Sequence, residues 1–282
     1  MKMHRKTLLG FFGVLGIWLT AGLALPFVNV LSMFTPAQLM VFRGLLTALI
    51  AFVGLRGSIG RVDKYTYLIA VILPLATLGL FQGIRYWGAC PTIIIIAATP
   101  LVNIIIGIFL GRRISRALVT GFVLVLGGVM IARWGGHFQW TGFAWSIFGA
   151  VMNGILYELF ARATARPLQK CFWGSLGMGV LGLFLSTSVS WTAITEPKIA
   201  LLVLGFVFVG GFLYWIANLT AFNNLPTTEA SVLAQVETPA VILGASFLLG
   251  EHLTVIQWIG VVITLCGAGY LSHWISKQTV QK

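Results

Sequence analysis

Short polar breaks divide the chain into apolar runs, each close to the length that crosses a lipid bilayer. About 20 apolar residues in an α-helix span the hydrocarbon core, where only helices and closed barrels satisfy their backbone hydrogen bonds. Only 9% of the 282 residues are charged, against roughly 25% in soluble domains. We therefore predict an all-α polytopic membrane protein of about ten transmembrane helices, with few residues left for a soluble domain. The predicted runs are 7–31, 36–55, 65–86, 91–111, 116–134, 141–161, 168–190, 198–222, 228–249 and 254–275.

The formal net charge of +12 is concentrated in alternate connections between the runs. If the N-terminus is inside, the outer connections carry only Arg85, Arg133 and Lys198. An excess of Lys and Arg on the cytoplasmic side is the positive-inside rule. The charge therefore predicts that both termini are inside, in a membrane such as the bacterial inner membrane, and argues against a nucleic-acid partner. The basic residues expected inside are Lys2, Arg5, Lys6, Arg56, Arg61, Lys64, Arg112, Arg113, Arg116, Arg162, Arg166, Lys170, Lys277 and Lys282.

Two stretches of the sequence repeat each other at a shift of 139 residues. Each has a Thr-Pro pair in an apolar run, a short polar break and a second run punctuated by glycine. An internal duplication in a membrane protein is typical of a transporter. Five helices per copy is an odd number, so we predict an inverted repeat of two five-helix halves, 1–140 and 141–282, with a substrate site between them near mid-membrane. The residues in register are Thr99-Pro100 with Thr238-Pro239, Gly111 with Gly250, Gly121 with Gly260, and Gly128 with Gly267.

Two ionisable side chains are expected deep in the membrane, where a charge is costly unless it is paired, neutralised or facing water. Arg43 lies about two turns into its run, and it could instead reach lipid phosphates or pair with a carboxylate. Glu237 is the only acid expected near the bilayer centre. It could carry a proton or bind an ammonium group, or it could only stabilise the break at Pro239. Glu158 precedes Arg162 by four residues, which predicts a local ion pair.

Further polar and aromatic residues complete the predicted substrate-binding set. The predicted apolar or stacking walls are Trp18, Tyr86, Trp87, Tyr214 and Trp215. Arg43 and Arg85 would anchor a carboxylate, Glu237 would face an ammonium group, and the neutral hydrogen-bonding residues would be Gln82, Asn103 and Asn218. An interfacial aromatic belt would also explain Tyr86 and Trp87. Pro100 and Pro239 interrupt helical hydrogen bonding and are predicted hinges.

No pattern of an intramembrane active site occurs within the runs. The four histidines fall at ends or hairpins, and the sequence has neither an HExxH nor a GxSxG motif. Cys90, Cys171 and Cys266 lie in separate runs, which is typical of apolar packing rather than of disulfides or metal ligands. We predict no enzyme, no cofactor and no metal site. An intramembrane enzyme or a lipid-handling protein remains the alternative from another class.

A sequence motif in the second half carries a family resemblance. Thr238-Pro239-Ala240-Val241 is followed by Leu249-Gly250-Glu251-His252-Leu253-Thr254 and then by Gly260. This order resembles the Pro-Val, Leu-Gly-Glu and Gly sequence of the drug/metabolite transporter superfamily, in its ten-helix EamA branch. The resemblance covers nearly the whole chain as a duplicated five-helix unit. In the first half, Arg112 stands where the family often has the acid represented by Glu251. The resemblance implies secondary transport of small metabolites, often export, through a cavity between the halves.

Together these observations predict a secondary transporter for a small metabolite that works by alternating access. Our best prediction is export of amino acids, aromatic or otherwise neutral. The alternative within transport is uptake or exchange of another metabolite, such as S-adenosylmethionine or a nucleoside. A proton carried by Glu237 is the candidate coupling ion, and a uniport or exchange mode stays open. The substrate, the direction of transport and the oligomeric state are not defined by the sequence.

Overall fold

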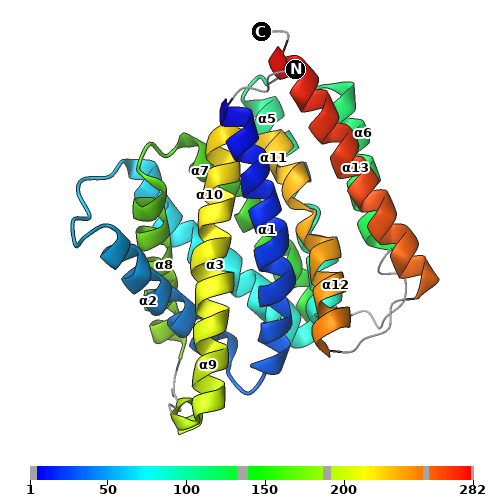
Figure 1. The fold of residues 1–282 in the computed structure, drawn as a ribbon. Coiled ribbons are helices and arrows are strands. Elements are labelled where there is room, and N and C mark those ends of the chain that lie inside the picture. Colours follow the sequence, from blue (N-terminus) through cyan, green and yellow to red (C-terminus); the bar gives the residue numbers. More distant parts are fainter. Residues whose placement is uncertain (1–4, 113, 132–138, 187–191, 250–253, 281–282) are drawn as a thin grey trace.

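The structure, a computed structural model, describes residues 5–112, 114–131, 139–186, 192–249 and 254–280. These residues fold into a bundle of helices, with no strand in any of the described ranges (Figure 1). The elements are α1 (Arg5–Val30), α2 (Pro36–Gly54), α3 (Lys64–Trp87), α4 (Ala89–Ile96), α5 (Thr99–Phe109), α6 (Arg116–Ile131), α7 (Trp140–Arg162), α8 (Pro167–Leu185), the 3₁₀ turn η1 (Thr192–Thr195), α9 (Pro197–Gly205), the π-helical η2 (Phe206–Leu213), α10 (Tyr214–Asn224), α11 (Thr227–Ala234), α12 (Glu237–Leu249) and α13 (Val255–Val280).

The predicted all-helical membrane fold is confirmed. Among the residues that the structure describes, seven helical stretches are long and apolar enough to cross a bilayer, and α5 and α6 are shorter apolar helices. Because α4 with α5, α9 with η2 and α10, and α11 with α12 each correspond to one predicted run, the helices form the ten expected stretches. Large apolar side chains cover the outside of the bundle, among them Phe109, Phe184 and Val255. Such a surface is stable in lipid rather than in water.

Local capping residues explain where several helices begin. The Thr35 hydroxyl accepts a hydrogen bond from the backbone of Gln38, whose side chain in turn accepts one from the backbone of Thr35. This capping box ends the connection between α1 and α2 and starts α2 at Pro36. Asp63 is the N-cap of α3, and its side chain accepts hydrogen bonds from the backbones of Tyr65 and Thr66.

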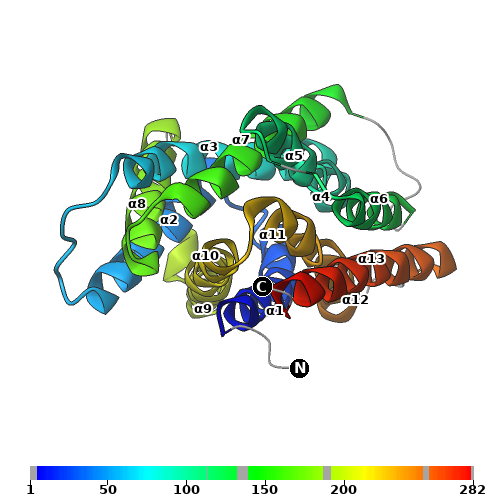
Figure 2. The same ribbon diagram turned by 90° about the horizontal axis from the view of Figure 1, so that it is seen from above.

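The helices pack as a central group with one pair at each end. In the view of Figure 2, α2 and α8 lie at one end, and α6 and α13 lie at the other. Between them α3 packs on α7, α1 packs on α10 and α12, and α5 packs on α7. Close approach requires glycine at some contacts: a Cβ on Gly44 of α2 would overlap the backbone of Gly179 of α8. The start of α1 and the end of α13 lie at the same end of the bundle (Figure 1).

Candidate functional site

A cavity lies in the centre of the bundle, where two of the helical stretches are broken. α4 ends at Ile96 and α5 begins at Thr99, while α11 ends at Ala234 and α12 begins at Glu237. The first break directly precedes Thr99-Pro100, and the second lies one residue before Thr238-Pro239. A proline leaves a preceding carbonyl without its helical hydrogen-bond donor. The cavity has a volume of about 40 Å³. Its lining comprises Ala21, Ala24, Arg43, Ala76, Thr77, Leu80, Ile93, Ile96, Asn153, Tyr157, Phe206, Gly210, Tyr214, Trp215 and Glu237.

Arg43 of α2 is the cation of this cavity, and it is only 4% exposed. Its guanidinium carbon lies 5.4 to 5.9 Å from the centres of four aromatic rings, a range typical of cation–π contacts. Within the described ranges no carboxylate forms an ion pair with it. Its Nε is buried and has no hydrogen-bond partner there. Arg43 therefore has capacity left for an anionic group. The four rings belong to Phe81, Phe206, Tyr214 and Trp215.

Glu237 is the acid of the same cavity and is also buried. It lies in the first turn of α12, where the free backbone N–H groups of a helix start favour a carboxylate. The Tyr214 hydroxyl donates a hydrogen bond of 2.9 Å to Glu237 Oε2. The Tyr214 ring also lies 5.7 Å from the Arg43 guanidinium carbon. One tyrosine thus contacts both charged side chains, and the cavity presents a cationic and an anionic group together.

The structure brings four of the predicted site residues together at the cavity and places the other seven elsewhere. Arg43, Tyr214, Trp215 and Glu237 line it. Asn103 and Asn218 are fully buried, and their amides donate to backbone oxygens, of Gly154 at 2.7 Å and of Tyr214 at 2.9 Å. Trp18 is partly buried and packs against the apolar core. The remaining four, Gln82, Arg85, Tyr86 and Trp87, all lie near the end of α3.

The end of α3 borders a second hollow. Arg85 is exposed and lines a cavity of about 310 Å³ together with Phe34 and Phe81. Phe81 also lies 5.9 Å from the Arg43 guanidinium carbon, so one ring contacts both Arg43 and the second hollow. Tyr86 is exposed, and Trp87 meets Phe143 edge to face at 5.9 Å.

Several lining residues were not predicted from the sequence. Asn153 and Tyr157 lie one turn apart on α7, and Tyr157 stacks on Phe222 with 4.2 Å between the ring centres. Phe206 and Gly210 come from the π-helical turn η2. Such turns inside α-helices are frequent at functional sites. The four-residue spacing of the polar pair on α7 was the available signal, whereas nothing in the sequence marks η2.

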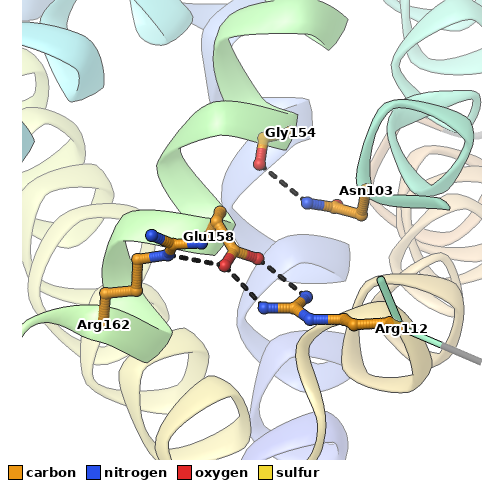
Figure 3. A network of polar contacts seen from close by, with 5 residues as sticks. All are labelled: Asn103, Arg112, Gly154, Glu158 and Arg162. Atoms are coloured by element: carbon orange, nitrogen blue, oxygen red, sulfur yellow. Dashed lines mark hydrogen bonds and ion pairs between the residues drawn. The ribbon is translucent and has the colours of Figure 1, made fainter. Parts of the chain in front are cut away.

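An ion-pair network lies on α7, one turn beyond Asn103's partner Gly154 (Figure 3). The predicted pair is confirmed, because Arg162 Nε donates to Glu158 at 2.8 Å. Arg112 adds two further hydrogen bonds to the same carboxylate, at 2.6 and 2.9 Å. Arg112 follows α5, so the network ties a connection in residues 1–140 to a helix in residues 141–282.

Comparison with known proteins shows that the second half of the chain is similar to a transporter family. Residues 140–272 match the EamA-like transporter family, which is a family of transporters and not of enzymes. Protein RarD of Salmonella typhi is 32% identical over 130 residues, which are 44% of this chain and 42% of that protein. Protein RarD of Salmonella typhimurium strain LT2 matches to the same extent. The match therefore spans less than half the length of these curated relatives.

A solved crystal structure has the same fold across almost the whole chain. It superposes with a TM-score of 0.79, covers 97% of this chain and 99% of its own, and is 15% identical in sequence. At that identity the likeness shows the fold alone. The family match and the apolar helices together identify a multi-span membrane protein.

Proposed function

We propose that the chain is a secondary transporter that exports neutral amino acids, aromatic ones included, because residues 140–272 match the EamA-like transporter family. The observation that carries this proposal is the joint presence of Arg43 and Glu237 in one buried cavity. A neutral amino acid has one carboxylate and one ammonium group. Arg43 would bind the carboxylate, and Glu237 would bind the ammonium group.

The walls of the cavity suit the side chain of such a substrate. Tyr157, Phe206 and Trp215 line it together with small residues such as Ala21 and Ala76. Aromatic walls favour apolar or aromatic side chains, and small residues leave room for them. The present volume of about 40 Å³ holds only a few water molecules. Loading therefore requires the helices to separate, as alternating access demands.

The proposed inverted repeat is supported by which helices pack together. If the first five helical stretches are exchanged with the last five, the α3–α7 contact becomes the α10–α1 contact, and both are present. Likewise the α5–α7 contact becomes the α12–α1 contact, and the α2–α8 and α6–α13 pairs map onto themselves. We propose rocking of the two halves about the cavity, with hinges at Pro100 and Pro239 where the helices are broken.

Both termini are proposed to be inside, in a bacterial inner membrane, on the strength of the positive-inside pattern. Glu237 is the proposed proton site, since it is the acid that lines the cavity.

The alternative within transport is uptake or exchange of S-adenosylmethionine or a nucleoside. The same aromatic walls and carboxylate could hold S-adenosylmethionine, whose sulfonium is a cation.

Counterflow into proteoliposomes tests the proposal. Vesicles holding the full-length protein are preloaded with one unlabelled solute, and uptake of its labelled form is measured for phenylalanine, leucine, S-adenosylmethionine and adenosine. We expect exchange of the amino acids and faster exchange than in protein-free vesicles. Phenylethylamine, which lacks the carboxylate, should compete poorly with phenylalanine in the wild type. Exchange of S-adenosylmethionine or adenosine alone would replace the proposed substrate, and exchange of none of the four would overturn the proposal.

A further inference from the structure

A third cavity lies outside the helical core, between two connections that belong to different halves of the chain. Its volume is about 430 Å³. The α2–α3 connection contributes Ser58, Gly60 and Arg61, and the α7–α8 connection with the start of α8 contributes Arg166 and Gln169. Both connections lie at the end of the bundle where α1 begins (Figure 1). This cavity is not part of the proposed transport site.

The lining of this cavity carries a net positive charge, with two arginines against one carboxylate. Arg61 and Arg166 line it, and neither forms an ion pair with any carboxylate that the structure describes. Asp63 is the one acid in the lining, and its oxygens already accept hydrogen bonds from both connections. The N-terminus of α8 adds the positive end of a 19-residue helix. The cavity therefore favours an anion over a neutral solute or a cation.

The walls are held in place by contacts between the two connections. Gln169 Nε2 donates to the backbone oxygen of Ile59 at 2.6 Å, and Gln169 Oε1 accepts from the backbone N–H of Arg166 at 2.9 Å. Gly60 has a φ of +64°, which a side chain would strain, and a Cβ there would lie 3.3 Å from Gln169 Nε2. A side chain at Gly60 would therefore strain the backbone and crowd the Gln169 amide. These contacts join the backbones of the two connections, each of which carries one of the arginines.

We propose that this cavity binds a phosphate group, supplied by the headgroup of an anionic phospholipid. Two guanidinium groups match the planar, bidentate geometry that phosphate oxygens accept. Basic pockets between transmembrane helices on the cytoplasmic side are typical headgroup sites. The two connections join the ends of α2, α3, α7 and α8, which are each long and apolar enough to cross a bilayer, so we place the cavity near the membrane surface. A bound headgroup links the two connections and so stabilises their contact.

The test uses the full-length protein in detergent and measures its melting temperature with added lipid. The probes are phosphatidylglycerol, phosphatidylcholine and inorganic phosphate. The variants are Arg61→Gln, Arg166→Gln and the two combined, with Arg56→Gln as the matched control. Arg56 is an exposed arginine of the same connection that does not line the cavity. Loss of both arginines should weaken phosphatidylglycerol binding about thirtyfold, from roughly one kcal/mol per basic residue.

The expected result is a rise in melting temperature with phosphatidylglycerol, retained by Arg56→Gln and largely lost in the double variant. If inorganic phosphate produces the same rise with the same dependence on the two arginines, the phosphate site stands and its source is a soluble anion. The proposal is overturned if phosphatidylglycerol has no more effect than phosphatidylcholine. It is equally overturned if the double variant keeps the wild-type rise. The single variants provide the same comparison if the double variant does not fold.

Discussion

At the scale of single residues, one substitution tests the role of the Glu237 charge. Glu237→Gln keeps an oxygen that can accept the Tyr214 hydrogen bond but removes the negative charge. Hydrogen bonds to charged groups contribute about 1.5–3 kcal/mol, so we expect amino-acid counterflow to fall roughly ten- to a hundredfold. The dependence of the rate on pH should flatten as well. Rates are measured in proteoliposomes at several pH values.

Glu229→Gln is the matched control for that variant, because Glu229 lies on α11 and does not line the cavity. Its rates should stay close to those of the wild type. Should Glu237→Gln keep both the wild-type rate and the wild-type pH profile, Glu237 would be a structural residue of the broken helix.

The sequence could locate the charged residues of the site but not most of its walls. Arg43 and Glu237 stand out because a charge far inside an apolar run is costly, so each demands an explanation. Phe206 and Phe81 do not stand out, because an aromatic residue in an apolar run is equally suited to lipid. Arg112 lies 46 residues before Glu158, and such a long-range pairing has no local sequence signal.

At the scale of helices and connections, the ion pairs of Glu158 predict that three substitutions lower the melting temperature by different amounts. Arg112 makes two hydrogen bonds to Glu158 and Arg162 makes one. Both arginines are about one-third exposed, so water reduces their contribution to about 0.5–1 kcal/mol each. We expect Arg112→Gln to lower the melting temperature more than Arg162→Gln does. Glu158→Gln should lower it most, because it leaves both cations unpaired. An equal effect of all three variants would mean that the network contributes through packing.

The contact between the α2–α3 and α7–α8 connections should depend on pH through Asp63. Burial opposes ionisation of Asp63, but hydrogen bonds from Thr164, Thr66 and Ala165 outweigh it and lower the pKa of its carboxyl from 3.8 to about 2. A carboxyl with a lowered pKa stabilises the fold above its ordinary pKa and loses that contribution as the pH falls towards 2. Asp63→Asn keeps one oxygen for the cap of α3 and removes the acceptor used by Thr164.

We therefore expect Asp63→Asn to destabilise the protein by about 1 kcal/mol near pH 7, a charge-assisted contribution reduced by the partly exposed setting. The difference from the wild type should shrink between about pH 4 and pH 2. Thermal unfolding in detergent across that range measures it. A difference that is constant with pH would mean that the carboxylate charge is not involved.

The sequence predicts a break in a helix only where a residue type, such as proline, interrupts the helical hydrogen bonds. The two Thr-Pro pairs predicted the breaks before α5 and α12, since a proline leaves a carbonyl without its donor. The π-helical turn η2 was not predicted, because Phe206–Leu213 has no residue that a regular helix excludes. Its wider turns lie against α1 and α2, and these contacts exist only in the folded bundle.

At the scale of the whole molecule, the number of helices followed from the sequence and their arrangement did not. A span is defined by its own apolar length. Which spans pack together depends on matching surfaces, and lipid makes most apolar faces equivalent. The close contact of Gly44 with Gly179 shows what decides such a pairing, yet the chain has 33 glycines, so no single one identifies its partner.

The orientation of the two halves relative to the membrane can be tested by labelling from one side. In an inverted repeat, the connection after the second helix of each half must lie on opposite sides of the membrane. Ser58 follows α2, and Glu196 lies in the connection after α8; both are exposed. In a protein without its native cysteines, Ser58→Cys should react with an impermeant maleimide only after the cytoplasmic side is opened, and Glu196→Cys should react in intact cells. Labelling of both from one side would exclude the inverted repeat, whereas labelling from the two sides in reverse order would keep the repeat and reverse the orientation.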